Sequence, residues 1–120
     1  MRNLILVLGM FVGITGFSQN KNAKATIEVD GVCGMCKERI EKASIQAKGV
    51  KSASWDVETH QLDLIYNERK TDLAIIQQSI ANSGHDTHHF KAKDKVYESI
   101  DPCCKYRDPQ VVEDHKDGAE

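Results

Sequence analysis

The sequence lacks the features that would indicate nucleic-acid binding or catalysis. Its 16 lysines and arginines are interspersed with 18 acidic residues, so it has no basic patch of the kind that nucleic acid selects. No general base, no nucleophile with an orienting partner and no cofactor-binding loop stands out, so we do not expect an enzyme. The sequence has no internal repeat and no low-complexity tract, and its 120 residues have room for one small domain.

Only one apolar run is long, and it occupies the first 18 residues. A short positive start is followed by an almost wholly apolar stretch, and Gly16 and Ser18 are small residues of the kind that precede a signal-peptidase cut. The run is too short for a spanning helix, and polar sequence follows at once. We therefore expect a signal peptide over 1–18, a flexible lead over 19–23, a periplasmic or secreted protein, and no stable membrane insertion after signal removal.

The sequence has only four cysteines, and they fall in two close pairs, Cys33/Cys36 and Cys103/Cys104. Four cysteines in an oxidising compartment would normally suggest two disulfides. A disulfide within either pair would not connect distant segments of the chain, and two adjacent cysteines form a strained disulfide at best. The spacing therefore favours a site built from thiols, or one bridge between the two pairs, over a disulfide framework.

The first pair lies where an alternating segment, 25–29, runs into an amphipathic one. This places Cys33 and Cys36 on a strand-to-helix turn, three positions apart, so that two thiolates can converge on one ion. A helix N-terminus and a neighbouring cysteine both favour the thiolate over the thiol. Because thiolate sulfur is soft, Cu(I), Zn(II) and heavier soft ions are the expected guests.

A Cys-x-x-Cys pair can also be a redox site, with Cys33 as nucleophile, Cys36 as resolving thiol and the second pair as a relay. Thioredoxin-type proteins usually have an aromatic residue before the pair, a proline within it and a later cis-proline facing it. This sequence lacks the first two, and its only prolines, Pro102 and Pro109, lie in the tail. A periplasmic thiol-disulfide oxidoreductase and a module held by structural disulfides remain the alternatives to metal binding.

Apolar periodicity predicts the element order β-α-β-β-α-β, an α+β ferredoxin-like sandwich with two helices on one face of a four-stranded antiparallel sheet. The expected inward-facing sets are Ala25, Ile27 and Val29; Ile40, Ala43 and Ala47; Ala53, Trp55 and Val57; Leu62, Leu64 and Tyr66; and Leu73, Ile76 and Ile80. We expect Gly49 to end the first helix, Thr71 to cap the second and 88–91 to form the last strand.

The strand, the Gly-x-Cys-x-x-Cys turn and the helix together resemble the heavy-metal-associated domain of small copper chaperones, metal-transport ATPase N-termini and periplasmic mercury-binding proteins. The resemblance covers 24–91, with one departure: the family usually has Met two residues before the first cysteine, where this sequence has Gly31. It implies Cys33 and Cys36 as metal ligands. The partner it implies is a metal-transporting ATPase or another metal-binding domain, and it also allows a metal-bridged dimer.

His85 lies in the loop after the second helix, which in this family lies beside the metal loop and usually carries Tyr, Phe or Lys. Some bacterial members are similar to this sequence in having His there. A neutral imidazole is a common metal ligand, so His85 is a candidate third ligand. The alternative is a surface histidine that merely replaces the usual tyrosine.

The segment 92–107 extends beyond the family's usual end. Residues 93–100 could form a short helix with an apolar side. The two adjacent thiols of Cys103 and Cys104 are well suited to bind one soft metal ion. Eleven residues can span about 35 Å, which is enough for the tail to fold back over Cys33 and Cys36. The alternative is a tail whose pair acts alone. Residues 108–120 are charged, and we expect them to be disordered.

These observations together predict an exported protein that carries or scavenges a soft metal ion by thiolate exchange. Cu(I) is the first expectation, Hg(II) the second, and Zn(II) or Cd(II) the third.

Overall fold

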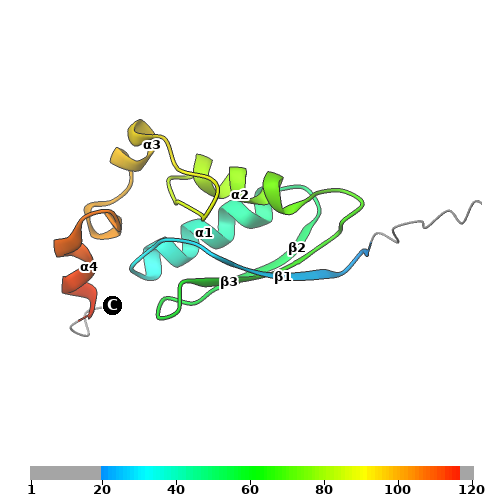
Figure 1. Ribbon diagram of the computed structural model, residues 1–120, viewed down its shortest axis with the longest axis horizontal. Helices are drawn as coiled ribbons and strands as arrows, with labels where there is room; N and C mark the ends of the chain where they lie inside the picture. Colours follow the sequence, from blue (N-terminus) through cyan, green and yellow to red (C-terminus); the bar gives the residue numbers. More distant parts are fainter. Residues whose placement is uncertain (1–19, 117–120) are drawn as a thin grey trace, which may run out of the picture.

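The computed structural model describes residues 20–116, so the expected signal peptide lies outside the described residues. The elements, in chain order, are β1 (Ala23–Glu28), α1 (Gly34–Gln46), β2 (Val50–Trp55), β3 (Gln61–Tyr66), α2 (Leu73–Asn82), α3 (Asp94–Glu98), the 3-10 helix η1 (Pro102–Cys104) and α4 (Pro109–Lys116) (Figure 1). Among these elements, no helix is both long enough and apolar enough to cross a membrane.

The three strands form one antiparallel sheet in the order β1-β3-β2. Both long helices, α1 and α2, lie on the same side of it (Figure 1). The central strand β3 buries Leu62, Leu64 and Tyr66 and exposes Gln61 and Asp63 on either side of Leu62, which is the predicted alternation. The α+β class, the antiparallel sheet and the placement of the helices on one face are therefore confirmed.

The prediction of a fourth strand over 88–91 is wrong: in the described residues the sheet has three strands. Where it would pair with β1, the described residues have a single antiparallel bridge between Val29 and Thr87. The Asp86 side chain accepts a hydrogen bond from the backbone N–H of Ala92, at 2.7 Å. This bond closes the intervening residues into a loop, so the chain turns toward the tail and does not continue along β1.

Helix α2 begins one residue later than expected. Asp72, not Thr71, is the N-cap, and its carboxylate accepts the backbone N–H of Ile75 at 2.9 Å. The side chain of Thr71 is buried instead. Gly49 follows α1 at φ 101°, a left-handed conformation that favours glycine, and directs the chain into β2.

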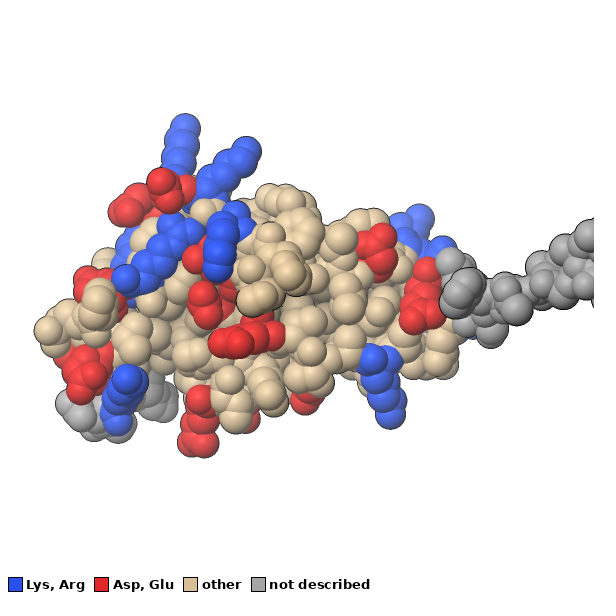
Figure 2. All heavy atoms as spheres, in the orientation of Figure 1, with Lys and Arg blue, Asp and Glu red and all other residues tan. Residues whose placement is uncertain are grey.

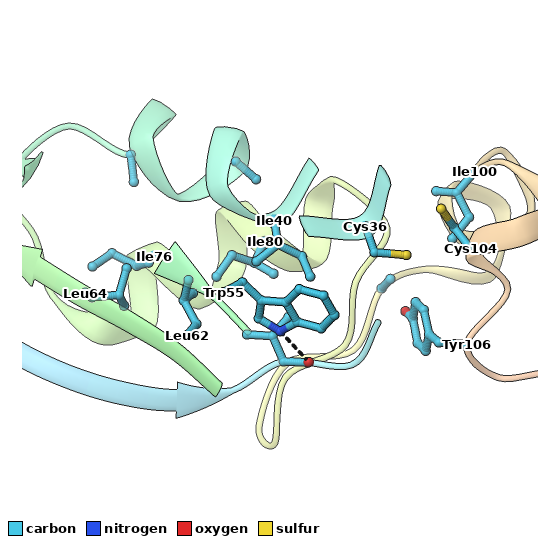
Figure 3. Packing of buried hydrophobic residues seen from close by; sticks show 14 of the residues in the cluster. Cys36, Ile40, Trp55, Leu62, Leu64, Ile76, Ile80, Ile100, Cys104 and Tyr106 are labelled. Carbon is cyan, nitrogen blue, oxygen red and sulfur yellow. Dashed lines mark hydrogen bonds between the residues drawn. The ribbon is translucent and has the colours of Figure 1, made fainter. Parts of the chain in front are cut away.

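Trp55 fills the space beneath the cysteine loop. A Cβ added at Gly31 would meet the far edge of the indole ring at 2.9 Å, so the ring occupies the space that a side chain at position 31 would need. The indole N–H donates to the Val29 carbonyl at 3.0 Å, which fixes the ring across the end of β1 (Figure 3). Glycine is therefore favoured at position 31, because the Trp55 ring from β2 occupies the space that a side chain there would need.

The tail is ordered over the described residues and packs on the domain. Tyr97, Ile100 and Tyr106 are buried in the common core. Within the segment expected to be disordered from residue 108 onward, the structure has helix α4, whose Val111 and Val112 are partly buried against that core. The last four expected-disordered residues, 117–120, lie outside the described residues.

Candidate metal centre

Cys33 and Cys36 lie at the start of α1. Cys33 is the N-cap, with extended backbone angles, and its carbonyl accepts the N–H of Lys37 at 3.0 Å. The two sulfur atoms are 3.4 Å apart, and both side chains are buried. The strand-to-helix turn therefore brings the two thiols together, as their spacing suggested, but beneath the surface.

The tail adds a third buried sulfur to this pair. Cys104, in η1, lies with its Sγ 3.3 Å from that of Cys33, although 71 residues separate them. The sulfur of Cys36 points from the start of α1 toward Cys104 (Figure 3). Cys103 is exposed, and its sulfur is 4.0 Å from that of Cys104. The sulfurs of Cys33, Cys103 and Cys104 all lie within 4.8 Å of one another.

An ion pair fastens the tail in this position. The Arg107 guanidinium donates to both oxygens of the Asp86 carboxylate, at 2.8 and 3.0 Å. Burial works against ionisation of Asp86, but Arg107 and the Ala92 N–H hold the pKa of this carboxyl below its usual range. A bidentate pair of this kind sets orientation as well as energy, so it fixes the chain just after the Cys103/Cys104 pair.

Tyr106 fastens the same part of the tail through the core. Its hydroxyl donates to the Gly84 carbonyl at 2.7 Å and accepts the Asp86 N–H at 2.9 Å. Its ring stacks on the His85 ring, with the centroids 5.2 Å apart. Tyr106 and Arg107 together hold the tail against the loop that follows α2.

The thiols differ in how readily they ionise. Burial opposes ionisation of Cys33, but the N–H groups of Cys36 and Met35 and the neighbouring thiols outweigh it and lower its pKa. Burial raises the pKa of Cys36. Burial and the adjoining thiols raise the pKa of Cys104 to about 12, against the effect of Arg39. A cation is therefore needed to hold all of these sulfurs as thiolates, so metal binding would release protons.

His85 lies beside this cluster but does not face it. Its Nδ1 is 2.8 Å from the Asp30 carbonyl and its Nε2 is 3.2 Å from a guanidinium nitrogen of Arg39. Since a guanidinium can only donate, Nε2 accepts and Nδ1 carries the proton. Both ring nitrogens have protein partners, so in this arrangement His85 offers no free atom to an ion. It is fully buried, not the surface histidine of the alternative interpretation.

Arg39 connects the helix, the histidine loop and the tail. One guanidinium nitrogen contacts His85, and another donates to the Asp101 carboxylate at 3.0 Å. Burial lowers the pKa of Arg39, but the nearby Cys104 and Cys36 sulfurs and Asp101 outweigh burial and raise it. A permanent positive charge beside Cys104 favours an anionic complex of several thiolates with a monovalent ion.

The sequence did not indicate Arg39, Tyr106, Arg107 or Asp86 as part of the site. Each is a common surface residue type with no motif around it, and their roles depend on where the tail docks. The one usable signal was position: Tyr106 and Arg107 lie two and three residues after Cys104, where an aromatic and a bidentate donor can fix the cysteine pair in place.

The site has the donor set of a soft metal ion. Several thiols converge from the α1 turn and from η1, most of them shielded from water. Thiolate ligands select Cu(I) and other soft ions over Mg(II) or Ca(II). Low coordination by two or three sulfurs suits a monovalent d10 ion, whereas Zn(II) prefers four ligands.

Comparison with known proteins places this chain among metal-binding domains. The model of the heavy-metal-associated domain family matches residues 26–86. A copper-exporting P-type ATPase of Staphylococcus haemolyticus is 38% identical over 64 residues, which are 52% of this chain but only 8% of that protein.

Solved structures similar to this chain include a metallochaperone and part of a P-type ATPase. A CopZ metallochaperone is 29% identical, with a TM-score of 0.52, over 54% of this chain and 98% of its own. The water-soluble region of the P-type ATPase CopA from Bacillus subtilis is 28% identical, with a TM-score of 0.52, over 58% of this chain and 46% of its own. The tail that carries the second cysteine pair lies beyond the matched family model. This chain belongs to the heavy-metal-associated domain family.

Proposed function

We propose that this protein binds Cu(I) through Cys33, Cys36 and Cys104 and passes it on by thiolate exchange. The observation that carries the proposal is the contact of Cys104 with Cys33, which joins a tail thiol to the family's cysteine turn. The similar proteins include one named a metallochaperone and one named a copper-exporting ATPase. Hg(II), Zn(II) and Cd(II) are the lower-ranked guests of the same thiols.

The chain's own residues account for how an ion would be held and released. Cys33, with its lowered pKa, is the thiol best suited to make the first bond. Cys36 and Cys104 then complete a three-sulfur site whose excess negative charge lies beside Arg39. Transfer needs an incoming thiolate to displace one sulfur at a time. That thiolate bonds to the ion as a protein sulfur leaves it, and the exposed Cys103, next to Cys104, marks the side from which it can approach.

The third thiolate makes this site a slower and tighter holder than a two-cysteine turn. An ion held by Cys33 and Cys36 alone is open to attack, whereas Cys104 covers it from the tail side. Release then requires η1 to move, which means loosening the Arg107–Asp86 pair or the Tyr106 contacts. The tail thus acts as a retention device, and partner binding is the event that opens it.

Export and partnership belong to the same proposal. The first 18 residues have the pattern of a secretory signal, which favours a periplasmic or secreted location. A metal-transporting ATPase, or another domain of the same family, is the proposed donor or acceptor, and a metal-bridged dimer is a further arrangement of the same thiols. Mass spectrometry of the exported protein should give a chain that begins at Gln19. A chain that retains Met1 would contradict export by cleavage.

Competition titration of the reduced protein against a coloured Cu(I) chelator tests the binding step. We expect Cys33→Ser with Cys36→Ser to weaken Cu(I) binding by about a thousandfold, or about 4 kcal/mol. Cys103→Ser, titrated with no more than one equivalent of Cu(I), is the matched control, because it removes an exposed thiol and leaves the three buried sulfurs intact. Unchanged affinity in the double variant would place the ion elsewhere and refute the proposal.

A thiol-disulfide oxidoreductase is the second candidate, favoured by the lowered pKa of Cys33 and its contact with two other thiols. Reduction of insulin by the dithiol form of the protein discriminates the two functions. The metal-carrier proposal predicts no turnover above the rate of a small dithiol. Catalytic turnover that is lost in Cys33→Ser would favour the redox function.

A further inference from the structure

We infer that the protein has a second position for a soft monovalent ion, built from Cys103, Met35 and His115 on the α4 side of the cysteine cluster. This inference deepens the proposed function and depends on it, because it supposes that the first ion occupies Cys33, Cys36 and Cys104.

The first two donors are already in contact. The Cys103 sulfur is 3.6 Å from the Met35 thioether sulfur, across 68 residues. Both side chains are exposed, and Met35 is one of the few large apolar residues of the described chain that remain so, at 47%. A thiol and a thioether that meet at the surface offer two soft sulfur ligands to one ion.

The third donor faces the same space from α4. Met35, Cys103 and His115 line one pocket, of about 320 Å³, whose walls also include Cys33, Gly34 and Glu38. Figure 1 shows α4 beyond the N-terminal end of α1, which is the end that carries Gly34 and Met35. The pocket has room for an ion and is open to solvent, so an ion could enter or leave without any movement of the buried cluster.

His115 is prepared for ligation in a way that His85 is not. Its Nδ1 lies 2.8 Å from the Val111 carbonyl, one turn earlier in α4. A carbonyl can only accept, so Nδ1 carries the proton and the lone pair of the neutral imidazole lies on Nε2. A backbone carbonyl that fixes the tautomer is the usual support of a metal-binding histidine. For His115, no partner of Nε2 is found among the described residues.

The donor types identify the class of ion. A thiolate, a thioether and an imidazole together suit Cu(I) or Ag(I), whereas thioether sulfur is a poor ligand for Zn(II) or Mg(II). Cys33 lines both the pocket and the buried cluster, so the two ions would lie on either side of its sulfur. The outer position is then the one from which an acceptor takes the metal, and the inner position is the one that retains it.

Titration of the reduced protein with Ag(I), a soft ion that does not change oxidation state, tests this inference. We expect two equivalents in wild type and one in Met35→Leu and in His115→Gln. Glu38→Gln is the matched control, since it changes a polar wall residue without removing a soft donor, and it should keep both equivalents. The ring nitrogen resonance of His115 should shift only with the second equivalent.

The outcomes separate this inference from the proposed function. Two results would overturn the second position while leaving the first intact. One is a single equivalent in wild type; the other is two equivalents in His115→Gln together with a His115 ring resonance that stays unshifted in wild type. Loss of the second equivalent in Glu38→Gln would overturn the soft donor set. No tight equivalent in wild type would refute the proposed function itself. Circular dichroism establishes that each variant is folded, which the exposure of Met35 leads us to expect.

Discussion

Acid should destabilise the metal-free protein because of one buried histidine. His85 is fully buried and keeps both ring nitrogens bonded, Nδ1 to the Asp30 carbonyl and Nε2 to Arg39. Burial, helped by the positive charge of Arg39, lowers the pKa of His85 from 6.5 to about 4. Protonation of Nε2 would both charge a buried ring and break its bond to Arg39, since neither group could then accept.

The size of the effect follows from the shift. In the unfolded chain the ring takes up a proton near pH 6.5, whereas in the folded chain it does so only near pH 4. Each pKa unit corresponds to about 1.4 kcal/mol, so this group costs the fold about 3 kcal/mol by pH 4. The sign is that of a base whose pKa is lowered by folding: stability is full above pH 6.5 and is lost progressively as the pH falls to about 4.

Other groups titrate nearby, so the measurement compares two variants. Asp86 also faces His85 and favours its protonated form, and Arg107 holds the pKa of Asp86 low. Burial raises the pKa of Asp30, which makes that carboxyl favour the folded state as the pH falls. A comparison with His85→Gln removes these shared contributions. Glutamine can donate to the Asp30 carbonyl and accept from Arg39, as the neutral ring does.

Urea unfolding of the reduced, metal-free protein between pH 7.5 and pH 4 measures the difference. We expect the free energy of unfolding of wild type to fall by about 3 kcal/mol more than that of His85→Gln over this range. Equal pH dependence in the two proteins would refute the reasoning, because it would mean that His85 is protonated equally well in the folded and unfolded chains.

Two more predictions concern the packing around the loop and the tail. Gly31→Met, which restores the family's usual residue, should destabilise the fold by about 2 kcal/mol because it overlaps Trp55, and Trp55→Leu should recover part of this loss in thermal unfolding. Arg107→Gln should cost about 2 kcal/mol by leaving Asp86 without its bidentate partner, and should speed Cu(I) transfer to a chelator in stopped-flow measurements. Equal transfer rates in wild type and Arg107→Gln would mean that the tail does not limit release.

The sequence predicted the part of the fold that depends on local periodicity. Alternation identified β1 and β3, and helical spacing identified the buried faces of α1 and α2, because these patterns report directly which side of an element meets the core. It failed at the fourth strand. The polar residues around His88 carry a weak alternation, and the hydrogen bond from Ala92 to Asp86 that closes this segment into a loop is not a local signal.

The site shows the same division between local and distant information. The Cys33/Cys36 turn was predictable because a strand, two cysteines at a fixed spacing and a helix are all adjacent in sequence. The position of Cys104 was only a hypothesis, since it depends on contacts of Tyr106 and Arg107 with a loop twenty residues earlier. Gly31 could have indicated that a large side chain from another part of the chain packs against position 31. Nothing in the sequence identified that side chain as Trp55.

The charged surface contributes little that is specific. Acidic and basic side chains are mixed over the face shown in Figure 2, as their interspersion in the sequence predicted. Surface ion pairs of this kind, such as Lys37 with Glu41 one helical turn later, typically contribute less than about 1 kcal/mol. Recognition of a partner is therefore expected to depend on the exposed Met35 and Cys103 more than on a surface patch of one charge sign.

X-ray absorption of the protein loaded with one equivalent of Cu(I) tests the central claim most directly. The proposal that Cys33, Cys36 and Cys104 share one ion predicts three sulfur neighbours in wild type and two in Cys104→Ser. Cys103→Ser, its immediate neighbour, should keep three. Two sulfur neighbours in both wild type and Cys104→Ser would show that the tail thiol does not bind the ion, and a nitrogen neighbour lost in His85→Gln would show that the histidine does.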